Sequence, residues 1–207
     1  MDLNKMFKKT SIRRPSSRFV EEGNKPEAPK GLLKKCNKCG KAIFTEEYKN
    51  NLYICPKCGG YLRMPAYERI ALVTEEGSFE EWDTGLVNTN PLRMKGYPDK
   101  VKALQEKTGL DEAVVTGKAR IGENEVVIMV MDGRFMTASM GAVVGEKVTR
   151  GIEKATEMKL PIVIFTCSGG ARMQEGMTSL MQMEKTAAAL KRHSDAGLLY
   201  IAVQTDP

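Results

Sequence analysis

The arrangement of apolar and polar positions changes at about residue 113, where strand-like and helix-like patterns begin to alternate. Short runs rich in Val, Ile and Met, bounded by turn residues, predict strands. Apolar residues at helical spacing, such as Val148, Ile152 and Ala155, predict helices between them. The predicted strands span 113–119, 125–132, 162–167 and 198–204, and the predicted helices span 145–159 and about 172–193. This alternation predicts an α/β fold with a parallel sheet and right-handed crossovers.

The first 112 residues lack this alternation. Prolines interrupt the first 30 residues, where we expect a disordered tail. The segment 66–112 mixes helical and loop signals, with a short helix expected over 65–73 and a loop over 85–98. The predicted domains are a basic tail over 1–30, a cysteine module over 31–65 and an α/β domain over 66–207.

Charge is concentrated at the N-terminus. Ten Lys and Arg against four Asp and Glu in the first 35 residues account for the whole net charge of +6. Such an arm either binds nucleic acid or an acidic partner, or is a solvated leader.

No apolar run approaches the roughly 18 residues that suggest a membrane span, and no apolar stretch makes the N-terminus a secretory signal. We therefore expect a cytoplasmic protein without membrane association.

Four of the five cysteines form two pairs, each with two residues between its members. Two such knuckles can complete a tetrahedral four-sulfur shell around a structural zinc ion, with Cys36, Cys39, Cys55 and Cys58 as ligands. Glycines after the second cysteine of each pair suit the backbone of a knuckle, and ribbon strands are expected over 42–44 and 52–54. A redox pair or disulfides are the alternative. The surrounding lysines suit nucleic acid, CoA phosphates or a partner subunit.

A second group of candidate residues, 167–176, lies between an apolar strand and the long predicted helix. Glycines here allow close approach to the backbone, and a helix N-terminus offers unpaired N–H groups to a phosphate or to a thioester enolate. A tight turn without a ligand is the alternative. The chain has no Walker loop, and Cys167 and the single histidine, His193, are interpreted as a buried thiol and a surface or capping residue. Any chemistry must then rely on backbone donors or on a cofactor.

The cysteine module and two runs of the α/β domain together resemble the β subunit of bacterial acetyl-coenzyme A carboxylase carboxyltransferase, and the resemblance covers the chain from about residue 31 onward. The four-cysteine module resembles the zinc ribbon of that family. The runs 132–141 with 145–147, and 168–176 with 179–183, resemble its core signatures. The resemblance implies a crotonase-like fold, in which stacked β-β-α units bind acyl-CoA, preceded by the ribbon.

The resemblance also implies an activity. The β subunit would work with a carboxyltransferase α subunit, a biotin carboxylase and a biotin carboxyl carrier protein. Together they would transfer the carboxyl group from carboxybiotin to acetyl-CoA, giving malonyl-CoA, in the first committed step of fatty acid biosynthesis. The biotin ureido group would take the proton itself, in agreement with the lack of a histidine base here. The implied cofactors are one structural Zn²⁺ and biotin carried on a partner protein.

Residue roles carried over from the family are expectations as well. Gly169, Gly170 and Ala171 would act as catalytic backbone donors, and Ser139, Met140 and Gly141 would line the acyl-CoA pocket. Arg172 would contact a CoA phosphate or form a helix-surface salt bridge. In the family a second Gly-Gly loop follows the segment that resembles Asp206-Pro207, so we expect this chain to be truncated at its C-terminus.

Two other functions remain open from the residues. A zinc-ribbon protein that binds RNA or DNA would use the basic arm, although aromatic residues make up only 6% of the chain. A crotonase-like hydratase or thioesterase would need a carboxylate or histidine base, which the sequence does not single out.

Overall fold

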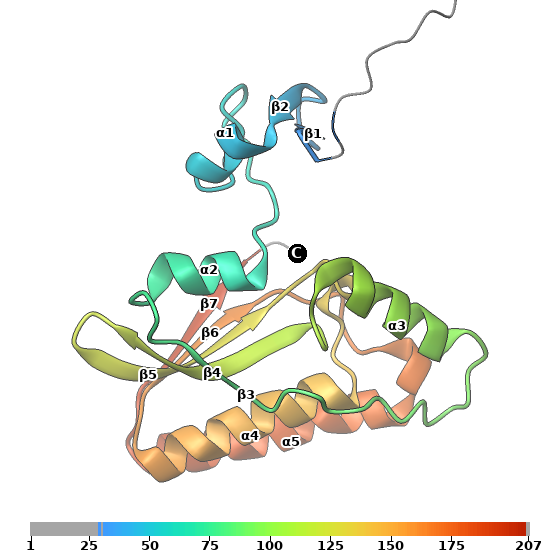
Figure 1. Ribbon diagram of the computed structural model, residues 1–207. Coiled ribbons are helices and arrows are strands. Elements are labelled where there is room, and N and C mark those ends of the chain that lie inside the picture. The colour runs from blue at the N-terminus through green and yellow to red at the C-terminus, as the bar shows by residue number, and fades with distance from the viewer. Residues whose placement is uncertain (1–28, 30, 206–207) are drawn as a thin grey trace, which may run out of the picture. The chain divides into compact units, whose positions relative to one another are not determined.

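The computed structural model describes residues 29 and 31–205, which form two compact units divided between Gly60 and Tyr61. The two units are described separately (Figure 1). The predicted basic tail over 1–30 lies almost entirely outside the described residues. The predicted domain boundaries therefore stay predictions.

The first unit is a small four-cysteine module. Strand β1 (Leu33–Lys35) pairs antiparallel with β2 (Ala42–Phe44), and the short helix α1 (Thr45–Asn50) follows at once. The strand expected over 52–54 is wrong, because Leu52 and Tyr53 have φ angles of 51° and 63°, which belong to a turn. The buried ring of Tyr53 instead meets that of Tyr48 edge to face, with ring centroids 5.0 Å apart. Among the described residues of this unit, the buried apolar side chains are Ile43, Tyr48, Tyr53 and two cysteines, a core too small to be stable alone.

The second unit is built on a five-stranded sheet in the order β3-β4-β5-β6-β7. Strands β3 (Glu80–Trp82), β4 (Val114–Ile121) and β5 (Asn124–Met131) pair antiparallel, and β6 (Ile162–Thr166) and β7 (Tyr200–Gln204) continue parallel to β5. The expectation of a parallel sheet is therefore correct only for the last three strands. The two-residue connection between β4 and β5 includes Gly122 with φ 58°, which closes a hairpin and makes that pair antiparallel.

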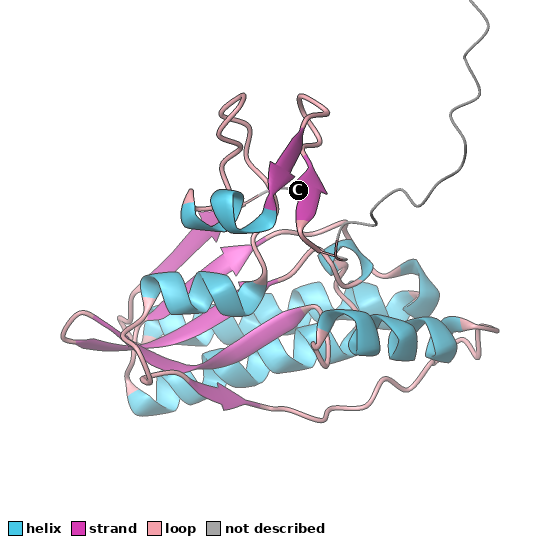
Figure 2. Ribbon diagram, turned by 45° about the horizontal axis from the view of Figure 1, so that its top comes forward, coloured by secondary structure: helices cyan, strands magenta, loops and turns pink. Residues whose placement is uncertain are grey.

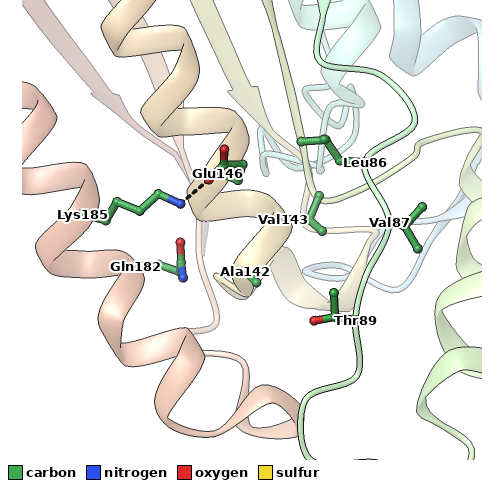
Figure 3. A pocket seen from close by; sticks show the side chains of 8 residues that line it. All are labelled: Leu86, Val87, Thr89, Ala142, Val143, Glu146, Gln182 and Lys185. Carbon is green, nitrogen blue, oxygen red and sulfur yellow. Dashed lines mark hydrogen bonds and ion pairs between the residues drawn. The ribbon is translucent and has the colours of Figure 1, made fainter.

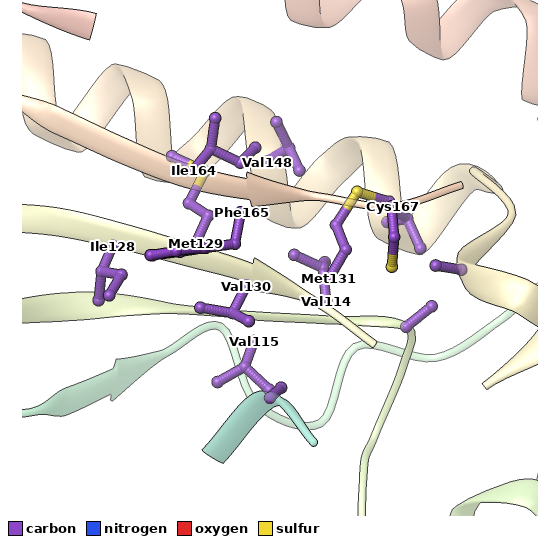
Figure 4. Close-up of a cluster of buried hydrophobic side chains, with 14 of the residues drawn as sticks. Val114, Val115, Ile128, Met129, Val130, Met131, Val148, Ile164, Phe165 and Cys167 are labelled. Carbon is purple, nitrogen blue, oxygen red and sulfur yellow. The ribbon is translucent and has the colours of Figure 1, made fainter. Parts of the chain in front are cut away.

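Helices cover both faces of this sheet. Helices α4 (Ala142–Met158) and α5 (Met177–Asp195) run side by side over one face, and α2 (Ala66–Val73) lies on the other (Figures 1 and 2). The core between them is made of Val, Ile and Met from β4 and β5, together with Phe165 from β6 (Figure 4). This β-β-α unit followed by a parallel β-α-β unit is the expected crotonase-like architecture.

Two sequence expectations about helices need correction. Helix α3 (Tyr97–Thr108) occupies a segment that we interpreted as mixed, and its first turn carries a proline, which a helix accepts there. The helix expected from about Arg172 begins only at Met177, because Gly176 adopts φ 56° and ψ −131°. A short 3₁₀ turn (Met173–Glu175) precedes that glycine. Arg172 therefore belongs to a loop, and the helix N-terminus is not next to the two glycines.

His193 is buried, contrary to the expectation of a surface or capping residue. Its Nδ1 atom lies 3.0 Å from Thr156 Oγ1, and its Nε2 atom lies 3.2 Å from the carbonyl oxygen of Leu199. Both ring nitrogens are thus used inside the fold.

Among the described residues, no helix has the length and apolar character needed to cross a membrane.

Candidate functional site

The four paired cysteines converge on one point in the first unit. The Sγ atoms of Cys36, Cys39, Cys55 and Cys58 all lie within 4.8 Å of one another. Cys36 and Cys58 are 3.7 Å apart, and Cys39 and Cys55 are 3.9 Å apart. Sulfurs that surround zinc tetrahedrally at about 2.3 Å lie about 3.8 Å apart, whereas a disulfide needs about 2.05 Å. The cysteines are therefore positioned to bind a metal ion, and the alternative of disulfides is excluded for this conformation.

The glycines that follow each pair build the two knuckles. The N–H of Gly40 donates to the carbonyl oxygen of Cys36 at 2.9 Å, and that of Gly59 donates to Cys55 at 2.8 Å. Both glycines have positive φ angles, 69° and 65°, which non-glycine residues adopt at a cost. The backbone N–H of Cys39 lowers the pKa of the Cys36 thiol to about 6. The pKa of the Cys58 thiol is lowered by the N–H of Gly60 but raised overall to about 12 by the neighbouring thiols.

In the second unit, the residues expected to donate hydrogen bonds follow β6 in an exposed loop. The N–H of Gly169 donates to the carbonyl oxygen of Thr137 at 2.8 Å, and that of Gly170 donates to Ser168 Oγ at 3.0 Å. Among the described residues, the N–H of Ala171 donates no backbone hydrogen bond. Of the three expected donors, Ala171 is thus the one whose N–H is available to a ligand.

The two candidate runs lie side by side. Met140 and Ala171 form a parallel bridge, in which the Met140 N–H donates to Gly170 and the Arg172 N–H donates to Met140, both at 2.9 Å. The structure therefore brings together the two runs to which the sequence assigned one pocket. Ser139 and Gly141 are buried, whereas Met140 is half-buried.

Backbone strain is concentrated beside this bridge. Met136, Thr137 and Ala138 have φ angles of 45°, 57° and 54°, a left-handed turn of three non-glycine residues. Each such residue costs about 1–2 kcal/mol. Since the carbonyl oxygen of Thr137 receives the N–H of Gly169, the strained turn directly shapes the donor loop. Strain that the surrounding structure maintains in this way is typical of functional sites.

Arg172 does not have either of its expected roles. Its side chain is fully buried, and its guanidinium holds both carboxylate oxygens of Glu112, at 2.6 and 2.8 Å. Burial alone would lower the pKa of Arg172, but Glu112 raises it well above its usual range. Arg172 also donates to the carbonyl oxygen of Ser139 at 2.7 Å. A guanidinium so placed neither faces solvent nor reaches a bound phosphate, and it stabilises the loop from inside.

Glu175 is a second buried charge that we did not single out from the sequence. Its Oε1 atom accepts from Tyr97 Oη at 2.5 Å and from Asn88 Nδ2 at 2.6 Å, and its Oε2 atom accepts from the N–H of Ala142 at 2.5 Å. Burial, together with the hydrogen bond to Glu175, raises the pKa of Tyr97 to about 12. Only the position of Glu175 inside the run 168–176 hinted at a role, and nothing in the sequence marked Asn88, Tyr97 or Glu112.

A pocket of about 220 Å³ lies between α4, α5 and the loop before α3 (Figure 3). The ion pair of Glu146 and Lys185 forms one part of its wall. Gln182 Oε1 is buried and has no hydrogen-bond partner among the described residues. It packs against Gly145, where a Cβ atom would lie only 2.3 Å away. None of the expected catalytic or substrate-binding residues lines this pocket; its lining is Leu86, Val87, Thr89, Ala142, Val143, Glu146, Gln182 and Lys185.

The model of the carboxyl transferase domain family matches residues 63–207. The chain is 51% identical over 208 residues to a protein from Clostridium novyi named acetyl-coenzyme A carboxylase carboxyl transferase subunit beta, covering 99% of this chain and 72% of that protein. It is 50% identical to a Clostridium tetani protein named as subunits beta/alpha, covering 98% of this chain and 36% of that one. These relatives are longer than this chain.

Solved structures agree with these matches. A transcarboxylase 12S structure with hydrolysed methylmalonyl-coenzyme A bound has a TM-score of 0.59 and 25% identity, covering 79% of this chain and 32% of that one. The β subunit of Pseudomonas aeruginosa geranyl-CoA carboxylase has a TM-score of 0.52 and 21% identity, covering 76% and 26%, and so shows the fold alone.

Proposed function

Because this chain belongs to the carboxyl transferase family, among the β subunits of acetyl-coenzyme A carboxylase carboxyl transferase, we infer that it transfers a carboxyl group from carboxybiotin to acetyl-CoA. The product is malonyl-CoA, and the step opens fatty acid biosynthesis. The observation that carries this conclusion is the 51% identity over 99% of the chain, which includes both candidate runs. It favours this reaction over a hydratase or thioesterase. We place the enzyme in the cytoplasm.

The chemistry needs a donor for a developing negative charge. Removing a proton from the methyl group of acetyl-CoA moves charge onto the thioester oxygen. We assign the N–H of Ala171 to that oxygen, because it donates to no acceptor among the described residues and directly follows the two exposed glycines. A preorganised donor of this kind contributes about 3–4 kcal/mol to transition-state stabilisation. Gly169 and Gly170 act by shaping the loop, since their own N–H groups are already used.

The histidine of this chain does not serve as the base. Both of its ring nitrogens are occupied within the fold, and the side chain is buried. When bound, biotin supplies the carboxyl group and the ureido atoms that accept the proton. The role of this chain is then to hold the thioester and its charge.

We assign a structural zinc ion to the four cysteines. Four thiolates leave no open position for water or substrate, so a catalytic role does not fit this donor set. The small core of the first unit explains why a metal is needed for it to fold.

The enzyme works as a multisubunit complex, and we propose an α carboxyltransferase subunit, a biotin carboxylase and a biotin carboxyl carrier protein as its partners. The Clostridium tetani relative named as subunits beta/alpha supports the first of these.

The test is co-expression with the matching α subunit, followed by an assay of carboxyl transfer between malonyl-CoA and free biotin. A chain extended to the length of the relatives runs alongside. Transfer in either form supports the inference. Silence in both, with the subunits shown to associate, contradicts it.

A second function, binding of RNA or DNA, rests on the first unit. The described part of this unit contains six lysines (34, 35, 38, 41, 49 and 57). Phe44 is 56% exposed, so its ring is able to stack on a base. Binding to single-stranded RNA that weakens steeply with salt, and that is lost in a Phe44→Ala variant, would support it. Equal binding by the variant would contradict it.

A further inference from the structure

A buried group of polar side chains adjoins the donor loop and draws on four separate segments of the second unit. Its two carboxylates, Glu112 and Glu175, both lie against one guanidinium, that of Arg172. It contains no residue to which we gave a catalytic role. Its members are Asn88, Tyr97, Glu112, Ser139, Arg172 and Glu175.

Glu175 makes the connection between the segments. Through Oε1 it holds Asn88 and Tyr97, which belong to the loop before α3 and to α3 itself. Through Oε2 it holds the N–H of Ala142, the first residue of α4. All three partners are donors, and the Nη1 atom of Arg172 lies 3.5 Å away as a fourth. A carboxylate, which only accepts, is therefore the side chain that this position requires.

The first turn of α4 binds this carboxylate through its backbone. The residue before α4, Gly141, offers no side chain to cap the helix, and Glu175 supplies the missing acceptor. A Cβ atom at Gly141 would lie 2.5 Å from Glu175 Oε1, so only glycine allows this approach. The short segment beside the donor loop is thus held at both ends, at Met140 by its bridge to Ala171 and at Ala142 by Glu175.

We propose that Glu175 is a positioning residue, which fixes the segment 139–142 against the donor loop and so aims the N–H of Ala171 at the thioester oxygen. This inference rests on the proposed function. Displacing a catalytic group by about 1 Å can cost about 100-fold in rate, and the bond to the charged oxygen forms only as the negative charge develops in the transition state. The loss should therefore fall on kcat rather than on KM.

The role of Glu175 can be tested with a substitution of the same shape, Glu175→Gln, and with a second substitution, Asn88→Asp, that should restore the lost hydrogen bond. In Glu175→Gln, the carboxamide must turn its NH₂ group toward one set of donors, either Asn88 and Tyr97 or Ala142. Asn88→Asp alone places two carboxylates together, because Asn88 Nδ2 is 2.6 Å from Glu175 Oε1. In the double variant, the new carboxylate at position 88 accepts from the new carboxamide at position 175. That carboxylate can also still accept the N–H of Asn90, which in the unsubstituted protein donates to Asn88 Oδ1 at 2.9 Å.

The experiment measures kcat and the KM for malonyl-CoA in complexes with the α subunit. We expect kcat to fall about 10- to 100-fold in each single variant, with KM within about twofold, and to recover at least about fivefold in the double variant. Glu153→Gln is the matched control, since that carboxylate pairs with Arg192 on the helix surface at 2.7 Å, and it should keep both constants.

An unchanged kcat in Glu175→Gln, a loss confined to KM, or a double variant no better than the singles would overturn the positioning role. If Glu175→Gln does not assemble, Tyr97→Phe removes one donor and keeps the ring, and a kcat that stays the same there has the same meaning. An inactive unsubstituted complex overturns the proposed function instead, so the two failures are distinguishable.

Discussion

At the residue scale, the exposure of side chains decides which groups act directly and which act through others. Ala171 is half-buried beside two exposed glycines, and its N–H donates no hydrogen bond to the described residues, whereas Arg172 beside it is fully buried and paired. The sequence places the two next to each other and does not reveal this difference. The burial of Arg172 depends on Glu112, sixty residues earlier in the chain, and such a tertiary pair leaves no local pattern.

Gly141 gives the first residue-scale prediction. Gly141→Ala forces a methyl group to within 2.5 Å of the Glu175 carboxylate, so the carboxylate or α4 must shift. We expect about 1–3 kcal/mol of lost stability, seen as a lower melting temperature, together with a lower kcat. Gly133→Ala is the control, because its Cβ atom would meet nothing closer than 3.8 Å. Equal melting temperatures for the two variants would argue against the tight contact.

The buried ion pair of Arg172 and Glu112 gives the second residue-scale prediction. Arg172→Met leaves Glu112 charged and without its partner in the interior, which costs about 3–5 kcal/mol. Replacing both residues, in Arg172→Met with Glu112→Leu, removes the orphaned charge and should recover much of that loss. Urea unfolding curves measure both effects. A double variant as unstable as the single one would mean that the pair is not coupled.

At the element scale, the sequence predicts the helices and strands that follow a regular apolar pattern. It does not predict the turns and helix starts that depart from such a pattern. The strands around β4, β5 and β6 and the body of α4 follow the apolar pattern closely. The start of α5 was misplaced because Gly176 was taken as a helical position, although its backbone angles stop the helix. The left-handed turn over Met136–Ala138 has ordinary side chains, so no sequence signal marked it.

Asp132 links two elements and gives a pH-dependent prediction. It accepts the N–H of Ala66 at the start of α2 at 2.9 Å, and it pairs with Arg134 at 2.6 Å. Burial alone would raise the pKa of Asp132, but the hydrogen bonds from Arg134 and Ala66 lower it below its usual value. Its stabilisation is therefore full above the ordinary aspartate pKa and is lost as the pH falls through the lowered value.

Replacing Asp132 by Asn should consequently lower the melting temperature at pH 7 and have little effect near the acid end of the folded range. The measurement is a series of thermal unfolding curves across pH for both proteins. Parallel curves, with the same difference at every pH, would show that ionisation of Asp132 does not contribute.

At the scale of the whole molecule, the two units differ in what holds them together. The four cysteines that are positioned to bind a metal ion were identifiable from spacing alone, because a knuckle is a local structure of a few residues. The donor loop was recognisable through its resemblance to a family. The buried group around Glu175 was not, since its members come from four segments that meet only in the fold.

Loss of the metal should destabilise the first unit and leave the second unit folded. Cys39→Ser takes one thiolate from the site, so we expect loss of bound zinc and proteolysis in the first unit, while the second unit stays folded on its own core. Metal analysis and limited proteolysis of the purified complex measure both. Cys167→Ser is the control, because that thiol lies in the second unit and outside the cluster, and it should keep the full metal content. Simultaneous cleavage of both units in Cys39→Ser would contradict their independence.

The central claim is that the N–H of Ala171 holds the thioester oxygen during carboxyl transfer. The most direct measurement is the structure of the complex with the α subunit and a bound acetyl-CoA analogue that carries an enolate-like oxygen. We predict that this oxygen lies about 2.7–3.1 Å from the Ala171 nitrogen, with Glu175 still bound to the N–H of Ala142. An analogue oxygen held by other donors, with the Ala171 N–H left free, would contradict the account.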